Sequence, residues 1–248
     1  MADTIRETLR EDSPAGSWLS IPSAQVAEQT AAADFDFVVI DTEHASTDVG
    51  TVESMVRAVD AAEGETAPLV RVAWNDHVRI KRVLDTGAAG VMAPQVDTAA
   101  EAEAFVEATR YPPEGRRGVA AARASNYVRE FEEYYGSAND AIATVAQVES
   151  AEAVGNAADV AAVDGLDSLF VGPADLSAAL GAFGEYESEP FLDAVGTVLS
   201  ESSVPVGTLA TSPEEVDHWA DVGFDYQIVG TDMGYLARGA AESLARYR

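Results

Sequence analysis

The sequence predicts a single-domain α/β protein with the (β/α)8 fold, the TIM barrel. Eight short apolar segments alternate with Ala-rich and charge-rich stretches of helical character along the 248 residues. No linker or change of composition divides the chain, and α/β barrels often reach this length as one domain. A doubly wound open sheet is the alternative, but the glycine-rich turn that follows the first strand in its dinucleotide-binding form is missing.

The predicted strands are short apolar runs bounded by turn-forming or charged residues. Two of the helices between them have recognisable starts, because Thr98 with Glu101 and Ser212 with Glu215 form the capping-box pattern. Pro213 stands at the first helical position of the second helix, where proline is favoured. The strands cover residues 17–21, 37–40, 68–72, 90–96, 143–149, 168–172, 204–210 and 226–230.

One segment, residues 111–140, departs from this alternation because it is longer than a single helix requires. Long connections inside compact domains are usually functional or disordered. The segment carries Arg116, Arg117 and Arg123 in an otherwise acidic chain. We interpret it as an ordered active-site or interface loop, with a simple surface excursion as the alternative.

The composition is strongly acidic, with 43 Asp and Glu against 15 Lys and Arg and a net charge of -28. Lys81 is the one lysine. Such a surface repels nucleic acid and anionic membranes, so we predict neither as a partner. The hydrophobic content of 47% is too high for a disordered chain, which favours a folded protein adapted to high salt, where ions screen the repulsion.

The sequence contains no cysteine, which excludes disulfides, thiolate zinc sites, iron–sulfur clusters and cysteine nucleophiles. The first residues lack the apolar core of a signal peptide, and no apolar run reaches transmembrane length. We therefore expect a soluble protein of the cytoplasm.

Chargeable and amide side chains follow several of the predicted strands. In a barrel of this kind the carboxyl ends of the strands meet at one face and form the active site. We therefore expect these side chains to share one pocket: Asp41, Glu43, His44, Arg71, Gln95, Gln147, Glu149 and Asp175.

This pocket would hold four carboxylates against one arginine and one histidine. Carboxylates that lie close together cannot all stay ionised unless positive charge is present. Oxygen ligands suit a hard divalent cation, Mg²⁺ or Mn²⁺, with Co²⁺ as a further possibility. Glu149 and Asp175 follow adjacent strands and can reach one ion. Each residue taken alone has a simpler interpretation, such as a helix cap, an ion pair or a structural histidine.

The turn GPADLS, residues 172–177, has the features of an anion site. Gly172 allows close approach of the backbone to a ligand, and Pro173 stiffens the turn. The free N–H groups at the start of the next helix, including those of Ala174 and Asp175, favour a carboxylate. A metal beside a carboxylate site suggests a 2-oxo acid as ligand, although a simple helix cap would have the same pattern.

Several segments resemble the HpcH/HpaI family of metal-dependent pyruvate aldolases, of the 4-hydroxy-2-oxoheptanedioate or 2-dehydro-3-deoxyglucarate aldolase type. The likeness runs in order from about residue 17 to the end of the chain. The segments are FDFVVIDTEHA, PLVRVAWND, IKRVLDTGAAGVMAPQVDTAAEA, TRYPPEGRRG, AQVES, LFVGPADLSAALG and IVGTDMGYLARG.

The resemblance implies a carbon–carbon lyase that reversibly cleaves a 4-hydroxy-2-oxo acid to pyruvate and an aldehyde through a metal-bound pyruvate enolate. It implies that Glu149 and Asp175 bind the metal and that Gln147 lies beside it. Ala174 would contact the substrate carboxylate through its backbone, and Trp18 is included among the substrate-binding residues. The identity of the aldehyde is left open.

The resemblance also implies catalytic roles for three residues. Arg71 would stabilise the enolate oxygen, His44 would be the general base acting with metal-bound water, and Asp85 would raise the basicity of His44. Asp41 and Glu43 would surround these groups without binding the metal. Members of the family are hexameric barrels, commonly built from dimers that exchange a C-terminal helix, so the resemblance implies a homo-oligomer.

Two departures and three alternatives accompany this interpretation. Asp34 stands where the family often has glycine, and the segment GAFGEYESEP is unlike the usual sequence, which affects the contacts to the aldehyde.

A Schiff-base aldolase is disfavoured because Lys81 lies in a helical stretch away from the strand ends. An acyl-CoA lyase of the citrate-lyase β type needs basic residues that are scarce here. A non-catalytic 2-oxo acid binding protein would not need His44 as a base.

Overall fold

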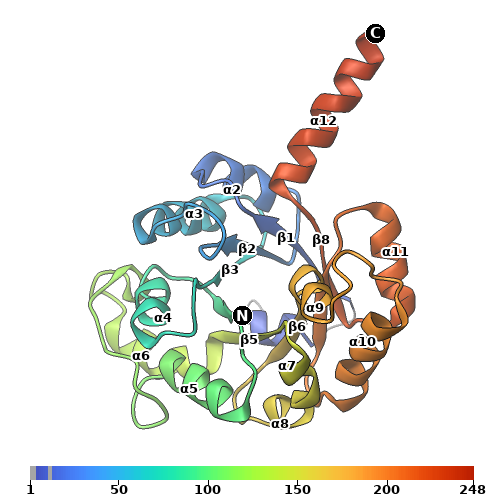
Figure 1. The fold of residues 1–248 in the computed structure, drawn as a ribbon. Coiled ribbons are helices and arrows are strands. Elements are labelled where there is room, and N and C mark those ends of the chain that lie inside the picture. Colours follow the sequence, from blue (N-terminus) through green and yellow to red (C-terminus); the bar gives the residue numbers. More distant parts are fainter. Residues whose placement is uncertain (1–3, 11–12) are drawn as a thin grey trace.

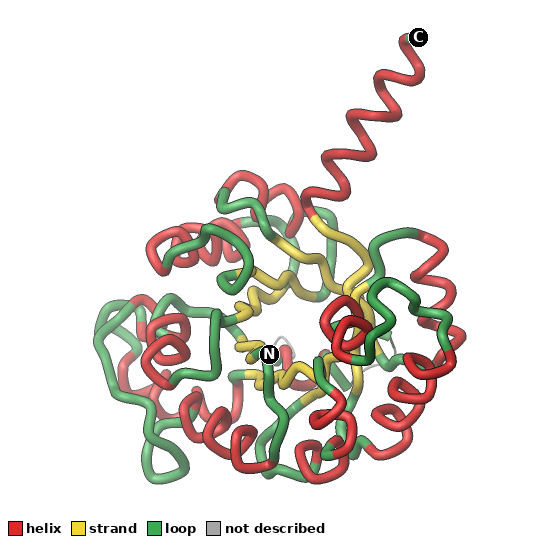
Figure 2. The backbone as a smooth tube through the Cα atoms, viewed as in Figure 1, coloured by secondary structure: helices red, strands yellow, loops and turns green. Residues whose placement is uncertain are grey.

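The computed structural model describes residues 4–10 and 13–248, which form a closed barrel of eight parallel strands in chain order (Figures 1 and 2). The predicted (β/α)8 fold is confirmed, and every predicted strand is present, with boundaries shifted by a few residues. The strands are β1 (Ala15–Leu19), β2 (Phe37–Asp41), β3 (Ala67–Arg71), β4 (Gly90–Ala93), β5 (Ala143–Val148), β6 (Ser168–Val171), β7 (Val206–Leu209) and β8 (Tyr226–Thr231).

Helices surround this ring of strands, as the red and yellow tubes of Figure 2 show. Both predicted capping sites are present, since Thr98 accepts from the N–H of Glu101 and Ser212 from that of Glu215. A 3₁₀ helix covers Arg123–Ser125. The α-helices of the described residues are α1 (Ile5–Thr8), α2 (Ala24–Ala31), α3 (Val49–Ala61), α4 (His77–Leu84), α5 (Ala99–Thr109), α6 (Phe131–Ala141), α7 (Ala151–Gly155), α8 (Ala157–Ala161), α9 (Pro173–Ala179), α10 (Glu189–Glu201), α11 (Pro213–Val222) and α12 (Asp232–Tyr247).

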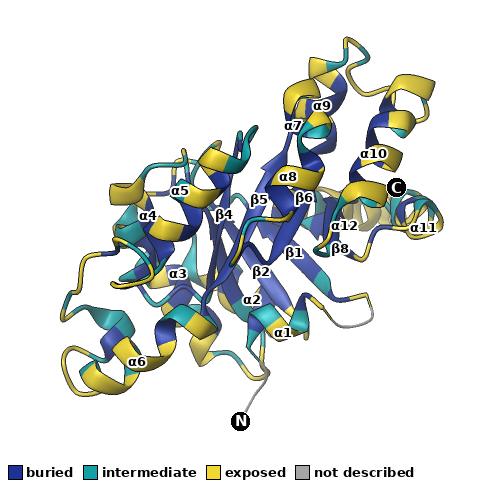
Figure 3. Cartoon of the chain, turned by 90° about the horizontal axis from the view of Figure 1, so that it is seen from below, coloured by how far each residue is buried: buried dark blue, intermediate teal, exposed yellow. Residues whose placement is uncertain are grey.

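The strands are buried on both faces, which is why they read as continuous apolar runs (Figure 3). Inside the barrel, aromatic rings fill space left by glycines on neighbouring strands. A Cβ on Gly16 would fall on the ring of Phe37, and one on Gly207 on the ring of Tyr226. The two rings pack edge to face with centroids 5.9 Å apart. This filling closes the barrel interior and leaves the strand ends as the place for a pocket.

Because all strands run in the same direction, their carboxyl ends meet at one face, called here the C-terminal face. The opposite end of the barrel is the N-terminal face. The register places Asp41 beside Arg71 on neighbouring strands. It also places Val148 beside Val171, so Glu149 and Gly172 follow at the same level. Strand pairing therefore gathers the side chains that the sequence scatters over more than a hundred positions.

The long segment 111–140 lies at the N-terminal face, because α5 returns the chain there and β5 begins there. It folds into the 3₁₀ helix and most of α6. Asn126, Tyr127 and Val128 have left-handed backbone angles, with φ of 47°, 52° and 82°. No residue of the segment lines the cavity at the C-terminal face described below. The predicted role as an active-site loop is therefore not supported within one chain, and an interface or a surface excursion remains.

The final helix, α12, extends away from the barrel and carries the C-terminus (Figure 1). Its first turn is anchored, since the side chain of Asp232 accepts hydrogen bonds from the N–H groups of Ser20 and Ile21. Beyond that turn its residues are largely exposed. Within residues 4–10 and 13–248, no helix combines the length and the apolar character needed to cross a membrane.

Candidate active site

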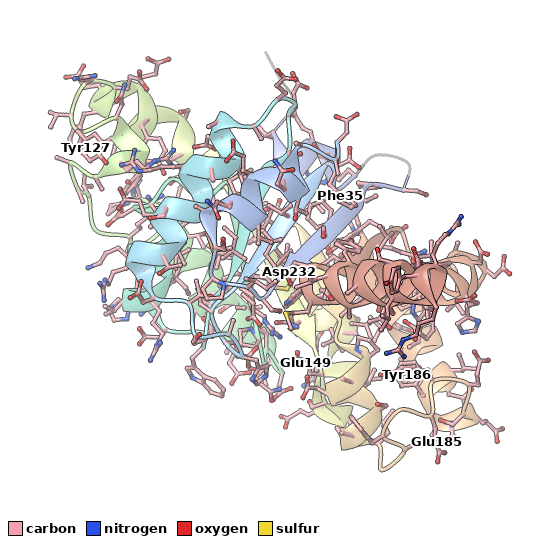
Figure 4. All side chains as sticks on the ribbon, turned by 90° about the horizontal axis from the view of Figure 1, so that it is seen from above. Phe35, Tyr127, Glu149, Glu185, Tyr186 and Asp232 are labelled. Carbon is pink, nitrogen blue, oxygen red and sulfur yellow. The ribbon has the colours of Figure 1, made fainter. Side chains whose placement is uncertain are left out.

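A cavity of about 360 Å³ opens at the C-terminal face of the barrel. Most of the predicted site residues line it, although they come from strands far apart in the sequence. Glu149, at its base, lies near the middle of the molecule seen from above (Figure 4). The predicted residues that the cavity brings together are Trp18, Asp41, His44, Arg71, Gln147, Glu149, Gly172, Pro173, Ala174 and Asp175.

Arg71, the last residue of β3, is held in one orientation. Its Nε and Nη2 donate to the two carboxylate oxygens of Asp41 at 3.0 and 2.9 Å, and its Nη1 lies 3.0 Å from Oε2 of Glu43. The guanidinium also stacks over the ring of Trp18, 4.5 Å from the centroid. Burial works to raise the pKa of Asp41, but the hydrogen bonds and charge of Arg71 outweigh it and hold that pKa below its usual value. The pair is therefore ionised and rigid.

The turn after β2 positions His44 at the mouth of the cavity. Asp41 Oδ1 accepts hydrogen bonds from the N–H groups of Glu43 (2.9 Å) and His44 (3.4 Å), which bends the chain back over the strand end. The His44 side chain is 68% exposed, and its Nε2 lies 3.8 Å from Oε1 of Glu43. Burial raises the pKa of Glu43, while the positive charge of Arg71 opposes the shift. His44 can thus exchange protons with solvent and still face the pocket.

Glu149, directly after β5, is almost fully buried. Its Oε1 accepts from Nε2 of Gln147 at 2.8 Å, and its Oε2 accepts from the backbone and side-chain amides of Gln95 at 3.1 and 3.0 Å. Burial raises the pKa of Glu149 to about 7. The N–H of Gln95 opposes this shift, and the negative charges of Asp175 and Glu43 reinforce it. The carboxylate is therefore oriented but lacks compensating positive charge.

Gly172 and Asp175 complete this side of the cavity. A Cβ on Gly172 would come within 2.9 Å of Glu149 Oε1, so only glycine leaves room for the carboxylate. Pro173 begins α9, and Asp175 lies in its first turn. Among the described residues, no side-chain hydrogen bond or salt bridge to Asp175 is formed, and its side chain is exposed to the cavity mouth. The glycine and the free N–H groups of the helix start are in the predicted places.

The residues present fit a divalent cation. The buried oxygen Gln147 Oε1 has no hydrogen-bond partner among the described residues. The carboxylates that line the cavity are those of Asp41, Glu149, Asp175 and Glu215, and Arg71 is already engaged by Asp41 and by Glu43. The described residues hold no group of three or more His, Cys, Asp or Glu arranged for a metal. A cation here would therefore rest on Glu149 and Asp175 and take further oxygens from Gln147, substrate or water.

Asp85 is the predicted catalytic residue that the structure does not bring to the site. It caps the C-terminus of α4, which carries the chain from the C-terminal face back to the N-terminal face. Its carboxylate lies 3.4 Å from Nη2 of Arg117. In the part of the chain that the structure describes, no hydrogen bond or ion pair links Asp85 to His44. Within one chain, Asp85 therefore cannot raise the basicity of His44, because the two residues lie at opposite faces of the barrel.

The cavity also has residues that sequence reasoning did not assign to it. They come from the ends of β1, β7 and β8, from β6, from the start of α11 and from the loop between α9 and α10, and all but Glu215 are uncharged. Two signals were available: the capping box at the start of α11 includes one of them, and the unusual segment GAFGEYESEP includes another. These residues are Ser20, Phe170, Tyr186, Leu209, Thr211, Glu215 and Thr231.

Comparison with known proteins places this geometry in a family. The family model described as HpcH/HpaI aldolase/citrate lyase matches residues 15–238. A 4-hydroxy-2-oxo-heptane-1,7-dioate aldolase of Salmonella paratyphi C is 38% identical over 253 residues, covering 100% of this chain and 95% of that protein.

Two solved structures share the architecture closely. An HpcH/HpaI aldolase/citrate lyase family protein from Burkholderia cenocepacia superposes with a TM-score of 0.94 at 35% identity and 98% coverage of both chains. The citrate synthase SbnG superposes with a TM-score of 0.84 at 31% identity, covering 98% of this chain and 97% of that one. The chain therefore belongs to the HpcH/HpaI aldolase/citrate lyase family.

Proposed function

We propose that this protein is a divalent-metal-dependent pyruvate aldolase that cleaves a 4-hydroxy-2-oxo acid to pyruvate and an aldehyde. One observation carries the proposal: the fixed guanidinium of Arg71 and the under-neutralised pair Glu149 and Asp175 face one cavity, with His44 at its mouth. The aldolase named among the relatives acts on a substrate of this class.

The pocket holds the pyruvate half of the substrate. Glu149, Asp175 and Gln147 would hold the metal, which when bound supplies a Lewis acid beside the 2-oxo group. The N–H groups of Ala174 and Asp175 at the start of α9 point to where a substrate carboxylate would bind. Arg71 places a permanent positive charge next to the 2-oxo oxygen. Trp18, stacked on that guanidinium, shields it from water.

Cleavage then moves one proton and one electron pair. His44 takes the proton of the 4-hydroxyl group, the C3–C4 bond breaks, and the new C=O becomes the aldehyde. The electrons of the broken bond move toward the 2-oxo oxygen, where Arg71 stabilises the negative charge of the enolate. A proton delivered to C3 gives pyruvate. Because His44 is mostly exposed, it can return its proton to water between turnovers.

The test is pyruvate release from a panel of 4-hydroxy-2-oxo acids, with Mg²⁺, Mn²⁺ or Co²⁺ and after chelation. We expect activity that disappears with chelator and returns with metal, and the panel identifies the preferred ion. Lys81→Arg should keep this activity, and borohydride with pyruvate should leave no covalent adduct. Full activity in chelator, or an adduct seen by mass spectrometry, would overturn the proposal.

The resemblance to a citrate synthase keeps one alternative, a reaction with an acyl-CoA partner. A long anionic cofactor needs basic residues, and Arg71 and His44 are the cationic or cationisable side chains that line the described cavity. We therefore favour the aldolase. Acyl-CoA turnover exceeding aldol cleavage in the same assay would reverse this preference.

We also propose that α12 packs on a second copy of the chain, in a hexamer as the family resemblance implies. Met233, Leu236, Leu244 and Tyr247 are exposed and repeat at spacings of three and eleven residues, which places them on one face of the helix. The helix stands alone beside the barrel (Figure 1). Leu236→Glu with Leu244→Glu should lower the mass measured by sedimentation. An unchanged mass would exclude α12 from the interface.

Finally, we propose that the acidic surface reflects adaptation to high salt. At a net charge of -28, self-repulsion destabilises the fold at low ionic strength, and dissolved ions screen it. The melting temperature should rise steeply from dilute buffer to molar salt. A flat response would leave the acidity without this explanation.

A further inference from the structure

The cavity has a second end, opposite the groups that hold the pyruvate half, and it is built from the later part of the barrel. Leu209 ends β7, Thr211 and Glu215 belong to the start of α11, and Tyr186 comes from the loop after α9. We call these four residues the acceptor end, because the proposed reaction releases the aldehyde on the side away from the metal ligands.

Glu215 is fixed in place by hydrogen bonds at the start of α11. Its Oε2 accepts from the backbone N–H of Thr211 at 2.6 Å and from the hydroxyl of Thr211 at 2.9 Å. Its own N–H donates to the side chain of Ser212 at 3.2 Å. Among the described residues no donor reaches the other oxygen, Oε1. The carboxylate therefore presents one free acceptor and a negative charge to the cavity.

Tyr186 is the second polar group of the acceptor end. Its ring packs against Phe191 and Trp219, with centroids 5.5 and 6.2 Å away, which fixes the direction of the hydroxyl. In Figure 4 it lies beside Glu185, to one side of Glu149. Burial raises the pKa of the phenol, and the charges of Glu215 and Asp175 add to this. No hydrogen bond to another described residue occupies the hydroxyl, so it is free to donate to a ligand in the cavity.

The charges around this end would oppose an anion. Glu215 faces it, Asp175 is assigned to the proposed metal, and Arg71 is bound to Asp41 and Glu43 at the opposite end. The nearest arginine on this side, Arg238, donates to the backbone oxygen of Thr211 at 3.2 Å and does not line the cavity. A carboxylate entering here would meet the negative charge of Glu215 and would give up water without gaining a described arginine or lysine at this end of the cavity.

We propose that Glu215 and Tyr186 select an uncharged, hydroxylated aldehyde as the acceptor. This inference rests on the proposed aldolase function and specifies its substrate class. A hydroxyl group on the aldehyde can donate to Glu215 Oε1, and an oxygen of the aldehyde can accept from the Tyr186 hydroxyl. The cavity volume, about 360 Å³, is near the lower end of ligand pockets, which suits pyruvate with a short aldehyde. The semialdehyde that 4-hydroxy-2-oxoheptanedioate would release carries a carboxylate, so it is disfavoured as the acceptor of this enzyme.

The test compares acceptors that differ mainly in charge. Glyoxylate has one oxygen more than glycolaldehyde and carries a negative charge. Succinic semialdehyde is a longer anion. In aldol addition with pyruvate and metal, kcat/KM for glycolaldehyde should exceed the values for both anions by about tenfold or more. Higher kcat/KM for either anion would overturn the inference, and loss of that preference in Arg238→Ala would identify the cation responsible.

Variants test which side chain sets the preference between charged and uncharged acceptors. Glu215→Gln keeps one oxygen for the N–H and hydroxyl of Thr211, so the helix start should survive, but it replaces the free acceptor by an amide nitrogen. It should raise kcat/KM for glyoxylate about tenfold and lower that for glycolaldehyde about fivefold, because the hydroxyl of the aldehyde loses its acceptor atom. Glu214→Gln, the same charge change on an exposed neighbour outside the cavity, should leave the ratio unchanged. Tyr186→Phe should lower kcat/KM for glycolaldehyde about fivefold. An unchanged ratio in Glu215→Gln would refute its role.

Failure of this inference can be told apart from failure of the proposed function. Proton exchange at C3 of pyruvate and decarboxylation of oxaloacetate need the enolate but no acceptor. If both occur and anions are the better acceptors, the acceptor inference alone is wrong. If neither occurs, and no aldehyde reacts, the aldolase proposal falls and the acceptor inference falls with it.

Discussion

The two faces of the barrel both carry a hollow, and the larger one is not at the site. The hollow at the N-terminal face measures about 560 Å³, against about 360 Å³ at the C-terminal face. It contains Arg57, which pairs with Glu53 at 2.7 Å, and Arg123, which pairs with Asp60 and donates to the backbone oxygen of Thr86 at 2.7 Å. Its arginines are therefore matched by nearby acceptors.

The C-terminal face differs in charge balance rather than in size. There Glu149 has a pKa raised to about 7 by burial, Asp175 has no side-chain partner among the described residues, and Gln147 Oε1 is buried without one. The comparison teaches that a hollow with arginines is a weak indication of function. Charges and polar atoms left unsatisfied by the protein are a stronger one, because folding alone would not retain them.

The largest expected effect separates the faces by removing one carboxylate from each. Glu149→Gln should reduce kcat for cleavage at least about a thousandfold, because it removes the charge of a proposed metal ligand and keeps the shape of the side chain. Asp60→Asn, which removes the partner of Arg123 at the N-terminal face, should leave kcat unchanged. Steady-state kinetics with saturating metal measure both. Near-native activity of Glu149→Gln would end the metal assignment.

The next effect divides the roles within the C-terminal face. His44→Ala should lower kcat for cleavage by about 10²–10⁴ but slow oxaloacetate decarboxylation less than about tenfold, since the latter needs no hydroxyl deprotonation. Arg71→Lys should depress both reactions by about a hundredfold, because both develop the same enolate charge. Equal loss of both reactions in His44→Ala would mean that the histidine supports the metal site, and another base would be required.

A smaller effect tests how tightly Glu149 is positioned. Gly172→Ala would place a Cβ 2.9 Å from Glu149 Oε1, so the carboxylate must shift. We expect kcat/KM to fall about ten- to a hundredfold, with metal affinity reduced in a calorimetric titration. Gly155→Ala is the matched control, since a Cβ there meets nothing within 4 Å. Equal kinetics for the two variants would show that the close approach is not needed.

The smallest expected effect concerns the N-terminal face, where the feature tested is backbone strain and the quantity measured is the stability of the fold. Val128 has φ of 82°, which is unfavourable for a β-branched side chain. Val128→Gly should stabilise the protein by about 0.5–1 kcal/mol, net of the added freedom of the unfolded chain, and raise the melting temperature by about 2 °C. Its kcat/KM should match the wild type. A change beyond about twofold would show that the two faces are coupled.

The sequence predicted the fold and most of the cavity lining at the C-terminal face for one physical reason. Strands buried on both faces must be apolar, so the eight runs were visible, and parallel strands in a closed barrel all end at one face. Chargeable groups at or shortly after the strand ends, such as Asp41, Glu149 and Asp175, therefore had to converge. Their position relative to a strand end was enough, without knowledge of any contact.

Residues farther from the strands could not be placed in this way. Asp85 was assigned to His44 by resemblance, but the direction of α4 carries it to Arg117 at the other face. The arginine-rich segment 111–140 follows a helix that returns to the N-terminal face, and so it leaves the cavity. Its role between chains stays a prediction.

The acceptor end shows most clearly what the tertiary structure alone decided. Glu215 was visible in the sequence as half of a capping box, and only the packing of α11 shows that the same carboxylate faces the cavity. Tyr186 comes from a loop whose course is set by contacts with Phe191 and Trp219 rather than by any local pattern. The sequence by itself determined the barrel and the charged strand ends, because both follow from periodicity. Loop placement depends on packing between distant segments, which periodicity does not encode.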